Sequence, residues 1–339
     1  MSFEVGQTVG GYELLETLDS RTGVAFKARN LIADRFEVLR ILPRQMGDDQ
    51  EQTARFQREI KVHSRLLHPN IVTFYTALAI DGQPVMTTEW VEGMTLATRL
   101  ERGAVKLGDA LNYACQALVA LECAHDLGVV HREVCPENMI LTPQGVLKLT
   151  GFGLAKAASD PELTQAGTIM GWIEYMSPEQ VQGVELGPAS DVYALGVVLY
   201  ELITGQVPFL GNSQVEVMLA HAKTPPRPPL ERNPRLPAEL SSIALTALAK
   251  DPEQRFPSAK AFRSVLEEVR AELAKTPEVL ESFPGQPSAP EPEPVAEVRV
   301  PPPPPAPAAW PLSNLIAVGV GTFILVVLLT VAVLRLFGA

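Results

Sequence analysis

Near the end of the chain, the 20 residues from Leu315 to Leu334 contain no charged side chain. A helix of about 20 apolar residues is long enough to cross the hydrocarbon core of a bilayer. Trp310 lies just before the run, where an interfacial aromatic residue is expected. We therefore predict a transmembrane helix over 315–334, followed only by Arg335 to Ala339. Such a helix would act as a C-terminal tail anchor, so the water-soluble fold must lie in the residues before it.

Two regions of different composition precede this helix. From Thr276 to Pro311 proline and glutamate dominate, and residues 301–307 read PPPPPAP. This composition predicts an extended, semi-rigid spacer over 276–311, with a disordered linker and a docking site for a proline-binding module as alternatives. Residues 12–270 instead show the apolar periodicity and turn spacing of a folded domain.

Composition excludes several classes of protein. The net charge of −11 and the pI near 5.1 argue against a nucleic-acid-binding surface. The cysteines Cys115, Cys123 and Cys135 have no metal-ligand spacing, and an odd number of them does not make a disulfide framework. The first residues have no secretory signal. We therefore expect the folded domain on the cytoplasmic side of the membrane, held there by its C-terminal helix.

The order of predicted elements indicates the α+β class. Strand-like runs at 12–18, 23–29 and 36–42 are followed by a helical stretch from Gln50 to Leu67. After Leu96 the pattern is mainly helical. This order predicts a small strand-rich lobe followed by a larger helical lobe.

Four segments carry a specific resemblance. Residues 131–156 read HREVCPENMILTPQGVLKLTGFGLAK, residues 171–180 read GWIEYMSPEQ, residues 190–209 read SDVYALGVVLYELITGQVPF and residues 250–256 read KDPEQRF. In this order they resemble the catalytic loop, metal loop, activation segment and following helices of protein kinases. The chain is most similar to bacterial Ser/Thr kinases of the eukaryotic type, which are often membrane-bound. The resemblance implies a two-lobed fold over 12–270, with ATP and Mg²⁺ as cofactors and proteins as substrates or partners.

The resemblance also shows where the phosphate-binding parts depart from the family. The glycine-rich loop is LDSRTG at 18–23, in which only Gly23 matches and Asp19 stands at a glycine position. Arg40 replaces the lysine that holds the phosphates, and Glu59 is its expected helix partner. An Arg40–Glu59 pair can also stabilise the fold without nucleotide. The resemblance places the following residues around the nucleotide: Gly23, Ala25, Val38, Glu89, Val91 and Ile140. Ala25 replaces the family valine and Val38 the family alanine, so the apolar slot either persists or is filled by Val38.

The parts that perform phosphoryl transfer depart further. Glu133 stands where the family has its catalytic aspartate, and the extra methylene displaces the carboxylate by more than an ångström. Cys135 replaces a lysine that contacts the γ-phosphate, and is expected to be a quiet, partly buried thiol rather than a reactive one. Asn138 matches a metal ligand. The aspartate that supplies the main Mg²⁺ ligand is Gly151, although Mg²⁺ needs anionic oxygen ligands.

Positions with a structural role match the family better. Glu179 and Arg255 match a buried ion pair, and Asp191 matches the aspartate that holds the catalytic-loop backbone. Trp172 replaces a threonine, where its indole would obstruct a substrate hydroxyl. Thr164 and Thr168 in the activation segment are candidates for phosphorylation by another kinase.

Three hypotheses follow from this pattern. The leading one is a tail-anchored pseudokinase that acts as a binding or regulatory scaffold. The second is a weak or atypical Ser/Thr kinase that uses Glu133, Asn138 and Arg40. The third is a nucleotide sensor that binds ATP without metal.

Overall fold

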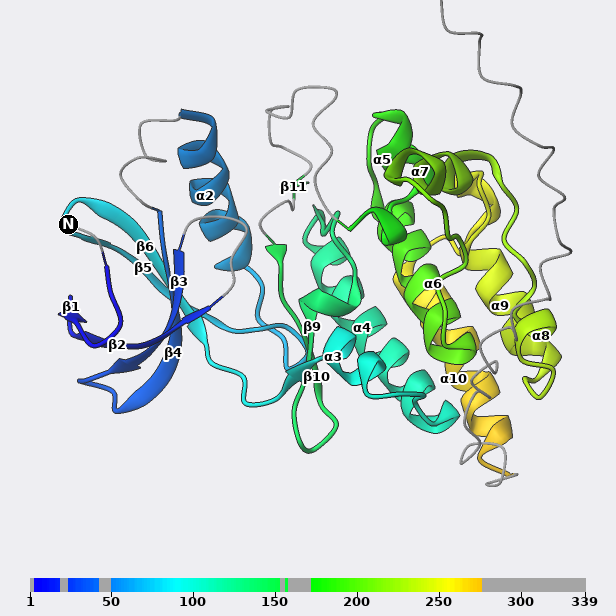
Figure 1. Cartoon of the computed structure of the whole chain (residues 1–339), viewed down its shortest axis with the longest axis horizontal. Coiled ribbons are helices and arrows are strands. Elements are labelled where there is room, and N and C mark those ends of the chain that lie inside the picture. The colour runs from blue at the N-terminus through cyan, green and yellow to red at the C-terminus, as the bar shows by residue number, and fades with distance from the viewer. Residues whose placement is uncertain (1–2, 19–23, 43–49, 153–155, 158–171, 276–339) are drawn as a thin grey trace, which may run out of the picture. The chain divides into compact units, whose positions relative to one another are not determined.

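The computed structural model describes residues 3–18, 24–42, 50–152, 156–157 and 172–275 (Figure 1). The predicted linker over 276–311 and the predicted transmembrane helix over 315–334 lie outside these residues. Among the helices that are described, none is long and apolar enough to cross a membrane.

The N-terminal lobe is built on one antiparallel sheet with the strand order β1-β2-β3-β4-β6-β5. The strands are β1 (Thr8–Val9), β2 (Tyr12–Leu18), β3 (Val24–Asn30), β4 (Arg35–Ile41), β5 (Phe74–Ile80) and β6 (Gln83–Glu89). Side chains alternate between the two faces of the sheet. On β4, Leu39 and Ile41 are fully buried on one face, so Val38 and Arg40 belong to the other. The sheet therefore presents Arg40 on the face opposite its main apolar core.

Helix α2 (Gln50–His63) packs against this sheet through Phe56 and Ile60 (Figure 1). The sequence predicted that this helix continues to Leu67, which is wrong by four residues. After His63 the backbone tightens, because the N–H of Leu66 donates to the carbonyl of His63, three residues back. The chain then reaches Pro69, which disfavours helical geometry in the preceding residue.

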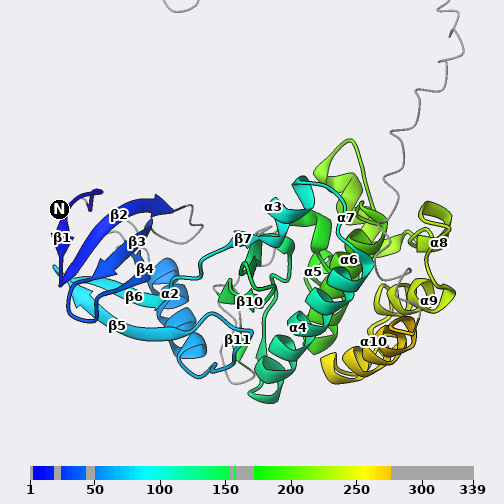
Figure 2. The same ribbon diagram turned by 90° about the horizontal axis from the view of Figure 1, so that it is seen from below.

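The C-terminal lobe is mainly helical (Figures 1 and 2). Its helices are α3 (Leu96–Glu101), α4 (Leu107–Asp126), α5 (Pro178–Gln182), α6 (Pro188–Thr204), α7 (Gln214–Lys223), α8 (Pro229–Arg232), α9 (Ala238–Ala247) and α10 (Ala259–Leu273), with short 3-10 turns η1 (Pro136–Asn138), η3 (Ile173–Tyr175) and η4 (Pro252–Gln254). Helix α6 is buried along nearly its whole length and forms the centre of the lobe. Because α6 is buried on all sides, its sequence is an almost unbroken run of hydrophobic residues. The predicted α+β fold with a strand-rich lobe and a helical lobe is confirmed.

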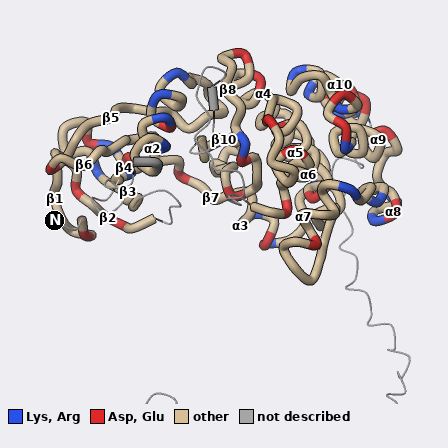
Figure 3. The backbone as a smooth tube through the Cα atoms, turned by 90° about the horizontal axis from the view of Figure 1, so that it is seen from above, with Lys and Arg blue, Asp and Glu red and all other residues tan. Residues whose placement is uncertain are grey.

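Short strands lie where the two lobes meet (Figure 2): β7 (Met94–Thr95), β8 (Val129–Val130), β9 (Met139–Leu141), β10 (Leu147–Leu149) and β11 (Lys156–Ala157). Strands β7, β9 and β10 form a small sheet, and β11 pairs with β8. Ile71 pairs with Leu149 in an isolated parallel bridge, and Lys148 Nζ lies 2.8 Å from Glu89 Oε2. These contacts connect the sheet lobe to the loops that carry the resemblance. Acidic and basic residues are interspersed over both lobes (Figure 3).

Candidate functional site

Arg40 of β4 forms an ion pair with Glu59 of α2. Glu59 is almost completely buried, and the Arg40 side chain is about one-fifth exposed. The carboxylate therefore has Arg40 as a charged partner inside the lobe, and the pair links the sheet to the helix. Because the guanidinium is committed to Glu59, its first role in this arrangement is to position α2.

The residues expected around an adenine base lie on neighbouring elements. Ala25 and Val91 are buried, while Val38 and Ile140 are half-buried. Gly23 lies outside the described residues. The Glu89 carboxylate is already engaged, because it pairs with Lys148 and accepts the N–H of Thr73 at 3.1 Å. Glu89 is therefore engaged within the protein, while Ala25 and Val38 lie on the paired strands β3 and β4.

The pairing of β3 with β4 shows which side chains lie next to Ala25 and Val38. Ala25 lies directly opposite Arg40, and Val38 lies opposite Lys27. Directly opposed side chains are close neighbours, with Cβ atoms about 4.5–5.5 Å apart. The small Ala25 therefore leaves room beside the large guanidinium of Arg40. The volume lost at Ala25 was expected to be compensated by the volume gained at Val38. The register instead makes Arg40 the direct neighbour of Ala25.

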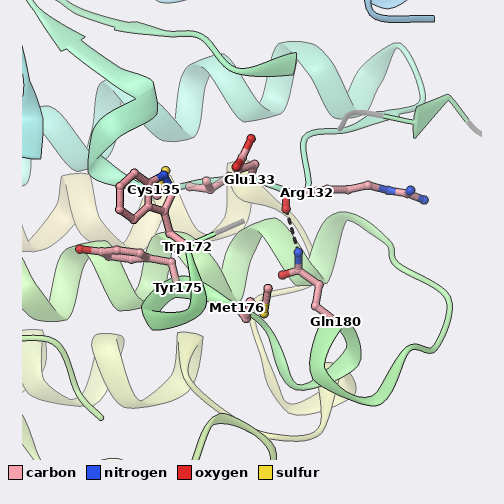
Figure 4. Close-up of a pocket in the computed structure, with 8 residues that line it drawn as sticks. Arg132, Glu133, Cys135, Trp172, Tyr175, Met176 and Gln180 are labelled. Carbon is pink, nitrogen blue, oxygen red and sulfur yellow. Dashed lines mark hydrogen bonds between the residues drawn. The ribbon is translucent and has the colours of Figure 1, made fainter. Parts of the chain in front are cut away.

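The backbone at the start of the loop from His131 to Asn138 is hydrogen-bonded to Asp191 of α6. The Asp191 carboxylate accepts the backbone N–H groups of His131 and Arg132, each at 2.8 Å, and lies 2.8 Å from His125 Nε2. Burial alone would raise the pKa of Asp191, but the hydrogen bond and charge of His125 hold it below its usual value. Gln180 Nε2 also donates to the Arg132 carbonyl at 2.8 Å (Figure 4). The loop backbone is therefore fixed, and Arg132 adopts a left-handed φ of 69°.

The expected metal site contains Asn138 and Gly151, which lie next to each other. Asn138 Nδ2 donates to the Glu133 backbone carbonyl at 2.8 Å. Gly151 has a φ of 85°, and a Cβ added there would lie 2.5 Å from Nδ2 and 2.6 Å from Oδ1 of Asn138. Real Cβ atoms essentially never make contacts below 3.0 Å. A side chain at position 151 would therefore require the Asn138 amide, the end of a flexible side chain, to move aside.

A small pocket lies next to this loop (Figure 4). It is lined by Arg132, Glu133, Val134, Cys135, Trp172, Tyr175, Met176 and Gln180. Cys135 is almost completely buried, and burial together with the nearby Glu137 carboxylate raises the pKa of its thiol. The Tyr175 hydroxyl donates to Glu201 Oε2 at 2.7 Å, and burial raises the pKa of Glu201 to about 7. Trp172 also lines this pocket, and its indole lies beside Cys135 (Figure 4).

A row of four rings in tilted and edge-on contact, here called the ring stack, connects both lobes, although no motif in the sequence predicted it. Its ring centroids are separated by 6.1 Å between Phe74 and His63, 5.4 Å between His63 and Phe152, and 4.6 Å between Phe152 and His131. His63 is one helical turn after Glu59, so both residues lie on the same face of α2. That spacing was the available signal. The stack shows that α2 and the His131 loop are joined through a continuous core.

Comparison with known proteins now identifies the family. The sequence pattern of the protein kinase domain matches residues 19–266. The chain belongs to the protein kinase family. It is similar to the serine/threonine-protein kinase pkn3 of Myxococcus xanthus, with 38% identity over 282 residues, 79% of this chain and 52% of that protein. It is also similar to the serine/threonine-protein kinase PrkC of Bacillus subtilis, with 36% identity over 260 residues, 76% of this chain and 40% of that protein.

A solved structure agrees with this family membership. The PknI kinase domain of Mycobacterium tuberculosis matches with a TM-score of 0.62 and 27% identity, over 80% of this chain and 100% of that one. The chain spans about half or less of the length of pkn3 and PrkC. Membership of a bacterial Ser/Thr kinase group is therefore confirmed for the domain.

Members of the protein kinase family generally bind ATP and Mg²⁺, and the two ligands fit this chain differently. For Mg²⁺ the expected carboxylate is absent at Gly151, and the Asn138 amide supplies only a neutral oxygen. In the part of the chain that the structure describes, no group of three His, Cys, Asp or Glu residues is placed to hold a metal. The residues do not fit a Mg²⁺ site. For the nucleotide, the expected residues Arg40, Ala25, Val38, Val91 and Ile140 remain a prediction.

Proposed function

We propose that this chain is a pseudokinase, a kinase-fold protein that acts as a binding or regulatory module rather than as a phosphoryl-transfer enzyme. The observation that carries the proposal is the absence of a carboxylate at Gly151, which lies next to the Asn138 amide. A kinase needs a carboxylate there to hold Mg²⁺ on the phosphates. Here Gly151 has no side chain, and the Asn138 amide, which donates to the Glu133 carbonyl, supplies only a neutral oxygen.

Two further features support the proposal. Cys135 is buried and cannot supply the positive charge of the lysine that it replaces. Trp172 lies beside Glu133, where a substrate hydroxyl would have to approach. Electrostatic stabilisers of this kind each contribute roughly a hundredfold or more to the rate, and parts that act as a unit are lost together.

The test is a phosphoryl-transfer assay on the purified full chain. We expect transfer of labelled γ-phosphate to the chain itself or to a generic protein substrate to stay at background with Mg²⁺ or Mn²⁺. Gly151→Asp alone should not restore it, because Arg40, Glu133 and Cys135 stay unchanged. Nucleotide binding should show no dependence on Mg²⁺ in the wild-type chain.

The alternative is a weak or atypical Ser/Thr kinase, favoured by the relatives and by a specific observation. The Arg40–Glu59 pair is formed and the ring stack through His63 and Phe152 is complete, as an active arrangement requires. Metal-dependent transfer that is abolished by Glu133→Ala or Asn138→Ala would establish this alternative and exclude the pseudokinase.

We further propose that the chain is anchored in a membrane through residues 315–334, with its kinase-fold domain in the cytoplasm. Its partners would be proteins, such as an active kinase or the substrates of one. Removal of residues 312–339 should release the chain from membranes, because it removes the long uncharged run at 315–334. Sedimentation of the truncated chain with the bilayer after a high-salt wash would contradict the anchor. Digestion of the domain by protease added outside intact cells would show the opposite orientation.

A further inference from the structure

A groove with a volume of about 530 Å³ lies on the helical lobe, formed by the segment before α7, by α7 itself and by the segment leading to α8. Its lining includes Phe209, Leu210, Leu219, Pro225, Arg227 and Arg232. Leu210 is 70% exposed and Leu219 is 50% exposed, which is unusual for two leucines in one hollow. Concave apolar surfaces of this kind are typical binding sites.

The charge of the groove indicates what it would bind. Arg227 is exposed and makes no hydrogen bond or ion pair with any residue in the described part of the chain. Arg232 is half-buried and donates to Gln206. The acidic lining residue Glu216 is itself engaged, because Oε2 accepts the N–H of Asn212 at 2.7 Å. The groove therefore offers an apolar floor with an excess of positive charge, which suits an acidic peptide with apolar side chains.

The chain contains such a peptide directly after α10. Residues 276–288 read TPEVLESFPGQPS, with the acidic residues Glu278 and Glu281 and no lysine or arginine. The apolar residues Val279, Leu280 and Phe283 lie between and just after these charges. We propose that this acidic segment, residues 276–288, docks in the groove of its own chain, with its apolar side chains on Leu210 and Leu219 and its carboxylates next to Arg227 and Arg232.

The connection is long enough. Helix α10 packs on α9, and α9 packs on α8, which carries Arg232. Packed helices lie about 8–10 Å apart, so two such steps separate α10 from α8 by about 20 Å. An extended chain covers at most about 3.3–3.6 Å per residue, so the ten residues from Leu273 to Phe283 reach about 33–36 Å. A short tether also gives the segment an effective concentration in the millimolar range, so a weak interaction keeps the groove occupied.

Docking of the acidic segment has a functional consequence that does not depend on phosphoryl transfer. A partner protein would reach the groove only by displacing the segment. Failure of this proposal would leave the pseudokinase proposal unaffected, because the two concern different surfaces and different measurements.

The test is amide hydrogen exchange in α7 of the full chain, purified in mild detergent. In the variant with Leu280→Asp and Phe283→Asp, exchange of the α7 amides should become about tenfold faster, because the covering segment is released. The matched control is Leu67→Asp, which changes a leucine that is 81% exposed on the other lobe and should leave α7 unchanged. Equal α7 exchange in the wild type and the tail variant would overturn the proposal.

A charge reversal tests the pairing and the identity of the occupant. Arg227→Glu should accelerate α7 exchange, and adding Glu278→Arg and Glu281→Arg to it should restore protection. Protection should also be independent of protein concentration, since the segment belongs to the same chain. Failure of the reversed charges to restore protection would overturn the proposal. Protection that appears only as the concentration rises would overturn it as well, because the occupant would then be a second copy.

Discussion

At the scale of single residues, three side chains of the candidate site have partners or surroundings within the protein itself. Arg40 pairs with Glu59, Asn138 donates to the Glu133 carbonyl, and Cys135 is buried beside Glu137. A buried polar group is costly unless it is hydrogen-bonded, so these contacts offset the loss of phosphate and metal as partners. These side chains are therefore held by the protein itself in the arrangement that the structure describes.

The cysteines allow a test at this scale. We expect alkylation of the native chain by iodoacetamide near pH 8 to modify the half-buried Cys123 first. Cys135 should react far more slowly, because it is 1% exposed and burial raises the pKa of its thiol, and reaction needs the thiolate. Mass spectrometry of digested protein measures the order. In the denatured chain all three cysteines should react alike, and early modification of native Cys135 would contradict its burial.

At the scale of elements, the ring stack decides how α2 is joined to the rest of the domain. His63 lies between Phe74 and Phe152, and its Nε2 lies 2.6 Å from the carbonyl oxygen of Val72. Glu59, Arg40 and His131 are the nearest charged or titratable groups. A neutral imidazole fits this place, whereas an imidazolium would be a buried charge. Protonation of His63 should therefore loosen the contact between α2 and the helical lobe.

Stability should depend on pH through this histidine. Burial lowers the pKa of His63 in the folded chain below its value of about 6.5 in the unfolded chain. The unfolded state then binds the proton more readily, so the contribution is fully present above about pH 6.5 and is lost as the pH falls below it. Urea unfolding at pH 7.5 and pH 5.5 measures this change in the wild type and in His63→Leu. The variant should lose less stability on acidification, and equal losses in the two proteins would contradict the prediction.

At the scale of the whole molecule, the helical lobe is held together by contacts of one buried arginine, Arg255. Arg255 Nη2 lies 2.6 Å from Glu179 Oε1, and its other nitrogens donate to the carbonyls of Ala189 and Ala249 at 2.8 and 2.7 Å. The Arg255 side chain has no exposed surface. One side chain thus joins α5, the start of α6 and the segment after α9.

Removal of this side chain should weaken the whole domain. Arg255→Ala leaves Glu179 buried without its partner, which typically costs about 3–5 kcal/mol of unfolding free energy. We expect a clearly lower melting temperature, measured by circular dichroism, while Arg263→Ala at a partly exposed pair should have a much smaller effect. Equal melting temperatures of Arg255→Ala and the wild type would show that the ion pair does not support the fold.

The amino-acid sequence by itself determined the order and class of the elements and the positions of most site residues. Apolar and polar residues alternate over 36–42, and apolar residues recur with helical spacing from Gln50. Both patterns are local, so they predicted β4 and α2 to within a few residues. The motifs around Glu133, Asn138 and Gly151 identified the family because their residue types and spacing are specific. They also showed which charges are missing, since the side chain present at a position is known without any coordinates.

Only the tertiary structure decided what fills the places of the missing groups. The strand register put Ala25 opposite Arg40, and packing between loops put the Asn138 amide into the space next to Gly151. The ring stack through His63 and the groove around Leu219 likewise join residues that are far apart in the chain. Such contacts depend on how elements pack and on ångström-scale displacements of side chains. Local periodicity carries no information about either, because it reports which face of an element is apolar and not what that face meets.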